Sequence, residues 1–154
     1  MLDNKTPPEE HFRRVRRLLP PLVNLDLLVL KGHLLMEEQL QLFLKELSRS
    51  PKFLRDARLS FNQKMHLFQA VSGCDAEWLT FITHLNTLRN SLAHRLEPGD
   101  VAALVDDVLR HYWQKGFRTP TSIRRRASLL RQTLVLVIGT LSGFVEGFTA
   151  SRTT

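Results

Sequence analysis

The chain has 154 residues, of which 43% are hydrophobic, so it is long and apolar enough to bury a core and is not a disordered tail. Its net charge is +7, and its one cysteine, Cys74, excludes an internal disulfide and a thiol-based metal site. The first four residues begin a polar N-terminus without the apolar stretch of a signal peptide. We therefore expect a cytoplasmic protein.

Two helices are predicted before residue 50. Pro7-Pro8-Glu9-Glu10 is typical of a helix start, and the helix should continue to about Leu19, where Pro20-Pro21 breaks it. Leucines then recur at close to helical spacing from Leu22 to about Leu47. Gly32 weakens this long helix by about 1 kcal/mol relative to alanine, and it leaves room for the close approach of a neighbour.

The middle of the chain contains clear helix boundaries. A short helical turn is expected from Phe53 to Ala57. Ser60 and Gln63 have the spacing of a capping box, which predicts a helix up to about Val71 that ends at Ser72-Gly73. Asp75 is then the expected N-cap of a helix from Ala76 to about His94.

Two further helices are expected after a loop at Leu96–Gly99. Asp100 should cap the first, from Val101 to about Gln114, and the second should run from Ser122 to about Phe148. Its uncharged stretch is shorter than the ~20 residues that span a bilayer, so a core or dimerisation helix is favoured over a membrane segment. No segment alternates with period two, and residues 1–154 are therefore predicted to form one all-α helical bundle.

Positive charge is concentrated in two regions. One is the Arg13–Arg17 cluster, and the other lies between Asp107 and Glu146, a window without any acid. Clustered arginines suit the phosphates of a nucleic acid, and a solvated surface is an equally good interpretation of the charge alone. The candidate RNA-binding residues in the second region are Arg124, Arg125, Arg126 and Arg131.

The candidate catalytic residues are Arg89, Asn90 and His94, near the end of the helix expected at residues 76–94. An arginine can neutralise a phosphate, and a histidine can transfer protons near neutral pH. On a regular helix Arg89 and His94 point about 140° apart. A wrapped arginine, a helix that ends at Ala93, or a second copy of the helix across a two-fold dimer would each reconcile them. Alternatively, Arg89 pairs with an acid of another helix and His94 is favoured by the helix dipole.

No cofactor or metal is predicted. His33 and Glu37 have a spacing that suits two metal ligands, but a third ligand is not evident, and a simple pair four residues apart is favoured. Glu37 or Glu38 is also a possible ion-pair partner for Arg89. Phosphate-binding glycine loops and the G-x-S-x-G motif are absent from the sequence.

The segment Leu88–His94 resembles the R-x-x-x-x-H signature of the HEPN superfamily, in which a polar residue, here Asn90, often follows the arginine. The segment Leu30–Glu38 resembles the long core helix of bacterial members, including proteins related to the mannitol-operon repressor. The resemblance covers about residues 22–115, and the basic and apolar helix at about 122–148 follows it.

This resemblance implies a homodimeric helical bundle with the motif in the dimer cleft. Many members are metal-independent endoribonucleases, often toxins or phage-defence effectors, that leave 2′,3′-cyclic phosphate ends. It implies that His94 acts as general base or acid, that Arg89 stabilises charge on the phosphate, and that Asn90 orients the phosphate or His94. RNA and an antitoxin or regulatory protein are the implied partners.

One position departs from the toxin pattern. Many toxin members carry a tyrosine two residues after the histidine, where a partner nucleotidyltransferase modifies it, and this chain has Leu96. Other members lack ribonuclease activity. A non-catalytic dimer that acts as a regulatory or interaction module is therefore the alternative function.

Overall fold

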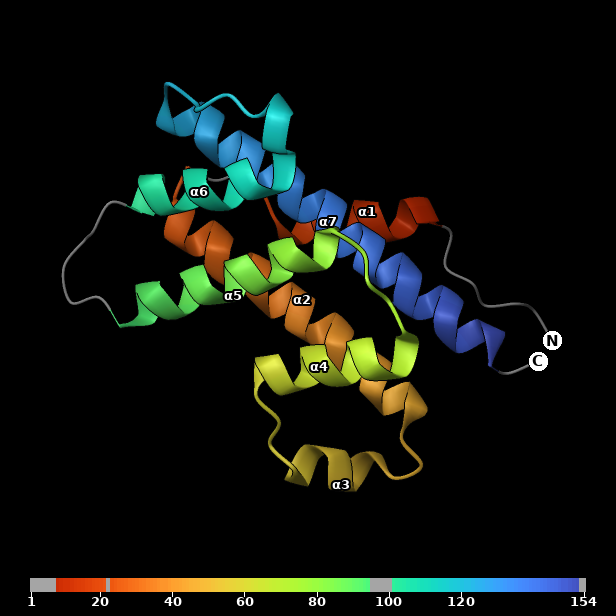
Figure 1. Cartoon of the computed structure of the whole chain (residues 1–154). Helices are drawn as coiled ribbons and strands as arrows, with labels where there is room; N and C mark the ends of the chain where they lie inside the picture. Colours follow the sequence, from red (N-terminus) through yellow and green to blue (C-terminus); the bar gives the residue numbers. More distant parts are fainter. Residues whose placement is uncertain (1–7, 22, 95–100, 153–154) are drawn as a thin grey trace.

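The computed structural model describes residues 8–21, 23–94 and 101–152, and these ranges fold into an all-α bundle (Figure 1). The predicted fold class is thereby confirmed. In chain order the elements are α1 (Pro8–Leu18), α2 (Leu25–Leu47), α3 (Pro51–Asp56), α4 (Phe61–Ser72), α5 (Trp78–Ala93), α6 (Val101–Trp113), the short 3₁₀ helix η1 (Gln114–Gly116) and α7 (Ile123–Ser151).

The two longest helices, α2 and α7, pack against each other and form the centre of the bundle. Gly32 lies at their contact, where a Cβ atom would come within 2.5 Å of Leu134 Cδ2. The absence of a side chain therefore allows the two helices to approach closely, which offsets the cost of a glycine inside a helix. Met36, Leu40 and Ile138 are fully or almost fully buried in the same layer.

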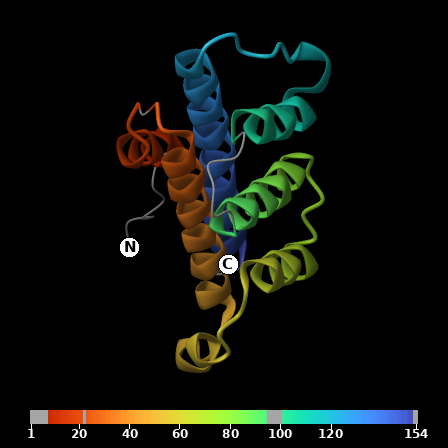
Figure 2. The ribbon, with the colours of Figure 1, turned by 90° about the vertical axis from the view of Figure 1, so that its left-hand side faces the viewer.

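Helix α1 packs on α7, on one side of the central pair, while α4, α5 and α6 lie on the other side (Figure 2). Phe12 of α1 fills the space beside Gly139, where a Cβ atom would lie only 2.4 Å from its ring. Arg131 of α7 donates hydrogen bonds to the backbone carbonyls of Arg16 and Leu19. These carbonyls are at the C-terminal end of α1, where a cation is favoured by the helix dipole.

Most of the predicted helix boundaries are close to those observed. The capping box of Ser60 and Gln63 is present, and Gly73 ends α4 with a left-handed backbone at φ 66°. Two starts differ. Asn24 caps α2, which begins three residues later than predicted, and α5 begins at Trp78 after Glu77, without a side-chain cap from Asp75. The predicted loop at 96–99 and the cap at Asp100 lie outside the described residues.

Helix α7 has the length and composition that would allow it to cross a membrane, with a mean hydropathy of 1.6 in its most apolar window. Half of that window is buried inside the protein. Leu130, Leu134 and Leu141 are completely buried against neighbouring helices. These contacts are those of a core helix, which was one of the two roles predicted for this segment.

Candidate functional site

Arg89 of α5 borders a small polar pocket of about 300 Å³. Its side chain is partly exposed, and Nη1 donates a hydrogen bond of 3.1 Å to Oδ1 of the neighbouring Asn90. The pocket is formed where α5 meets α2 and the start of α4. Its lining residues are His33, Glu37, Ser60, Phe61, Asn62, Asn86, Arg89 and Asn90.

A chain of hydrogen bonds joins three helices at the base of this pocket. Asn86 Nδ2 donates to Asn62 Oδ1 at 3.0 Å, so Asn86 Oδ1 is left to accept from His33 Nε2 at 2.9 Å. The imidazole of His33 is therefore protonated on Nε2. Its Nδ1 is a buried acceptor without a hydrogen-bond partner among the described residues. The ring also packs on Phe61, at a centroid distance of 4.4 Å.

Burial lowers the pKa of His33, although the bond to Asn86 and the charge of Glu37 act in the opposite direction. At neutral pH the ring is accordingly uncharged. A neutral ring protonated on Nε2 presents a lone pair at Nδ1, which favours a donor in its vicinity. The pocket thus has the neutral ring of His33 in its wall, together with the donors of Arg89.

The acids of α2 are paired elsewhere. Glu37 Oε1 lies 2.7 Å from Lys64 Nζ, and Glu38 lies 3.0 Å from Arg14. Neither forms an ion pair with Arg89, and within the described ranges Arg89 is not ion-paired with any carboxylate. The predicted pairing of Glu37 or Glu38 with Arg89 is therefore wrong, because each acid has a nearer cation on another helix.

His94 occupies a different position from Arg89. It is the C-cap residue of α5, it is exposed, and it does not line the pocket that Arg89 borders. The helix ends at Ala93, as one of the three predicted arrangements required, but within the described residues His94 and Arg89 share neither a hydrogen bond nor a pocket lining. Asn90 is exposed beside Arg89 and lies in the pocket lining. One chain thus brings together Arg89 and Asn90, and leaves His94 apart.

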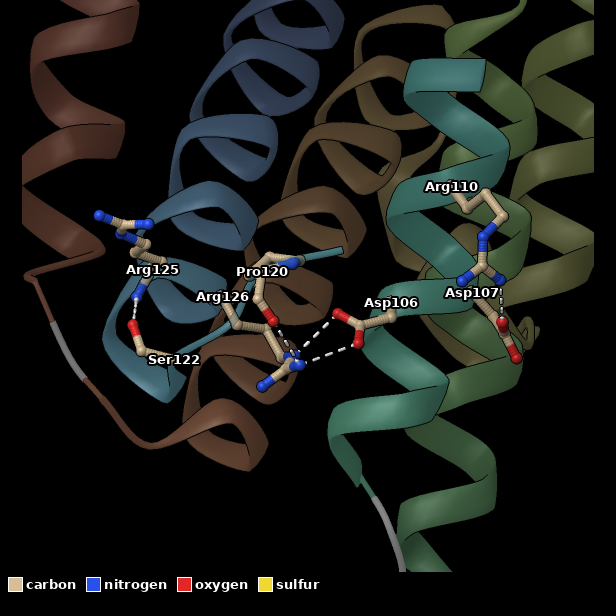
Figure 3. A network of polar contacts seen from close by, with 7 residues as sticks. All are labelled: Asp106, Asp107, Arg110, Pro120, Ser122, Arg125 and Arg126. Atoms are coloured by element: carbon tan, nitrogen blue, oxygen red, sulfur yellow. Dashed lines mark hydrogen bonds and ion pairs between the residues drawn. The ribbon is translucent and has the colours of Figure 1, made fainter. Parts of the chain in front are cut away.

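The four candidate RNA-binding arginines divide into two pairs. Arg124 and Arg125 are exposed in the first turn of α7. Arg126 instead forms a two-point ion pair with Asp106 of α6, while Arg125 leaves α7 on the other side (Figure 3). Arg131 donates its hydrogen bonds to backbone carbonyls at the C-terminal end of α1. Arg126 and Arg131 therefore have structural contacts, and Arg124 and Arg125 present their charges to solvent.

The part played by Asn62 and Asn86 was not predicted from the sequence. Asn86 is buried and bonded to His33, from which it is separated by 53 positions. His33 was considered with Glu37, but the two side chains have separate partners. In the described part of the chain, groups of three or more His, Cys, Asp or Glu residues that could hold a metal ion do not occur.

Comparisons with known proteins do not identify a relative, since neither a family model, nor a curated protein, nor a solved structure matches the chain.

Proposed function

We propose that the protein is a HEPN-like, metal-independent endoribonuclease that acts as a homodimer. The observation that carries the proposal is the position of Arg89: its partly exposed side chain lines a polar pocket, its guanidinium is bonded to Asn90, and it is not ion-paired with any carboxylate of the described residues. A guanidinium without a carboxylate partner is available to bind the oxygens of a phosphate. A phosphate group of RNA would supply these oxygens.

The proposed reaction needs no group beyond RNA and the side chains. The 2′-hydroxyl oxygen attacks the adjacent phosphorus and loses its proton to the imidazole of His94. The bond from phosphorus to the 5′ oxygen breaks, and that oxygen receives a proton from an imidazolium or from water. The products are a 2′,3′-cyclic phosphate and a 5′-hydroxyl. Arg89 stabilises the additional negative charge on the phosphate oxygens in the transition state.

The exposed face of α5 supports a dimeric site. Its exposed residues are uncharged and polar or small, namely Thr80, Thr83, Thr87, Asn90 and Ala93. Charged residues are depleted from the centres of protein interfaces, and a two-fold axis places the same face of both copies together. Pairing through the end of α5 would bring His94 of a second copy toward Arg89, which would complete the site that one chain leaves open.

The test is RNA cleavage in EDTA by the purified protein, with a labelled structured RNA and analysis of the product ends. The wild type should cleave and leave cyclic phosphates, whereas His94→Ala and Arg89→Ala should each lose at least roughly a hundredfold in rate. His66→Ala, which alters an exposed histidine of α4, is the matched control and should retain full activity. Unchanged cleavage by both motif variants would refute the proposal.

A non-catalytic dimer of the same fold is the second candidate, and the separation of His94 from the pocket of Arg89 favours it. It predicts a protein that binds a partner or ligand without RNA turnover. It also predicts that Arg89→Ala lowers the free energy of unfolding or weakens the dimer, because Arg89 would then have a structural role. A small loss would agree with an arginine that lines an open site.

Under the first proposal, a toxin or a phage-defence effector remains the expected biological role.

A further inference from the structure

A second cavity, of about 600 Å³, lies between the start of α5 and the end of α6, away from the pocket of Arg89. Aromatic side chains form much of its wall, namely Trp78, Phe81, Tyr112 and Trp113, and the imidazoles of His84 and His111 complete it. Glu77, Thr80 and Gln114 supply polar groups at the same cavity. The cavity therefore combines flat apolar surfaces with hydrogen-bonding groups.

The two histidines meet edge to face, with their ring centroids 4.7 Å apart. His111 Nδ1 lies 2.7 Å from the backbone carbonyl of Asp107, and only a protonated nitrogen can donate to a carbonyl. When the His111 ring carries a single proton, that proton is on Nδ1, and Nε2 is an acceptor. Burial, and then the proximity of His111, lower the pKa of His84, which keeps this ring neutral at pH 7.

Two further features distinguish this cavity from an ordinary surface hollow. Gln114 has a φ of 48°, a left-handed conformation that is costly for a residue with a side chain and that is often found at functional sites. Burial raises the pKa of Tyr112, so its hydroxyl remains a hydrogen-bond donor. Lys115 and Arg118 are exposed in the segment that follows the cavity.

We propose that this cavity binds an unpaired nucleobase of an RNA. Every base has a flat face that stacks on aromatic side chains, and a polar edge that imidazole rings and an amide can recognise. A metal ion fits less well, because among the described residues no group of three or more His, Cys, Asp or Glu side chains is placed to hold one. The nearby cations suit the phosphates on either side of the base.

The inference rests on the proposed function and adds a substrate feature to it. Trp78 and Arg89 are on the same helix, and the rise of 1.5 Å per residue places them about 16 Å apart along its axis. A base held in the cavity would therefore stand several nucleotides from the phosphate at Arg89. The cavity would select RNA that is single-stranded at that distance from the cleaved bond.

Tryptophan fluorescence gives a direct test, because the chain has two tryptophans and both line the cavity. We would titrate the purified protein separately with adenosine monophosphate, uridine monophosphate and ribose 5-phosphate. A saturable change with the nucleotide and none with the sugar phosphate is the expected result. The absence of a change with adenosine and uridine monophosphates alike, or an equal response to ribose 5-phosphate, would overturn the inference.

Variants separate this site from the catalytic one. His111→Ala, at an exposed position, and Trp113→Leu should each weaken nucleotide binding roughly tenfold, while His66→Ala should not change it. Arg89→Ala should bind the nucleotide as the wild type does. Base binding without RNA cleavage would refute the proposed function alone. RNA cleavage without base binding, with the rate unchanged in His111→Ala and Trp113→Leu, would refute base binding in the cavity and leave the proposed function standing.

Discussion

Replacement of Arg126 by methionine tests whether this arginine belongs to the fold or to an RNA-binding surface. Its Nε and Nη2 atoms lie 2.7 and 3.0 Å from the two carboxylate oxygens of Asp106, and Nη2 also donates to the carbonyl of Pro120 at 3.0 Å. The side chains of Arg126 and Asp106 are only 14% and 8% exposed. The pair is therefore buried and well aligned, so the loss of one partner should lower the free energy of unfolding.

Arg126→Met keeps most of the apolar stem and leaves the carboxylate of Asp106 buried without its cation. Loss of one partner of a buried pair costs about 3–5 kcal/mol. Because Arg126 keeps some exposure, we expect the lower end, a loss of about 3 kcal/mol in the free energy of unfolding. For a chain of this size that corresponds to a fall in Tm of about 6–12 °C.

The assay is urea unfolding followed by circular dichroism, with Arg125→Met as the matched control. Arg125 is the exposed neighbour in the same turn, so its replacement should change the free energy of unfolding by less than about 0.5 kcal/mol. The double variant Asp106→Leu with Arg126→Met should recover much of the loss, since no charge is then buried alone. A stability of Arg126→Met equal to that of Arg125→Met would refute the structural role.

Two further predictions concern the core. Burial lowers the pKa of His33 below its ordinary 6.5, so the unfolded chain binds this proton more tightly than the folded protein does. The free energy of unfolding should therefore fall as pH drops below 6.5, by at most about 1.4 kcal/mol per pH unit for this group. Urea unfolding at pH 7.5 and 5.5 should show a smaller fall for His33→Gln than for the wild type. An equal fall in the variant would contradict this. Gly32→Ala should lose about 1 kcal/mol, because the clash with the buried Leu134 exceeds the gain of about 1 kcal/mol in helix propensity. Gly143→Ala, which meets no atom within 4 Å, should instead gain stability, and a gain in both variants would show that Leu134 yields freely.

Local signals predicted the helices well. A capping box acts within four residues and a terminal glycine acts through its own φ, so Ser60 and Gly73 marked the ends of α4 correctly. The prediction of Asp75 as an N-cap was wrong because several residues of this stretch can precede the first turn of the helix. The residue before α5 is Glu77, which already has helical dihedral angles and does not form a side-chain cap. Periodicity does not resolve such competition.

The contacts that define the site are tertiary, and this explains why they were not predicted. Positive charge at Arg126 is visible in the sequence, but its partner on α6 is 20 positions away, and only the fold shows that this charge is neutralised inside the protein. The same is true of His33, whose partner Asn86 lies on another helix. Residue type indicated which chemistry was available. The packing of α2, α5 and α6 determined which side chains meet.

Because α1 packs on α7, the first helix of the bundle cannot complete its packing until the last one has been synthesised. Arg131 holds the end of α1 at Leu19, a contact across 112 positions of the chain, and α7 also covers the central face of α2. Neither early helix can complete its core until the ribosome has released most of α7. During synthesis, α1 and α2 therefore expose apolar side chains that are buried in the folded protein. Chaperones that bind exposed apolar surface would recognise the nascent chain at this stage.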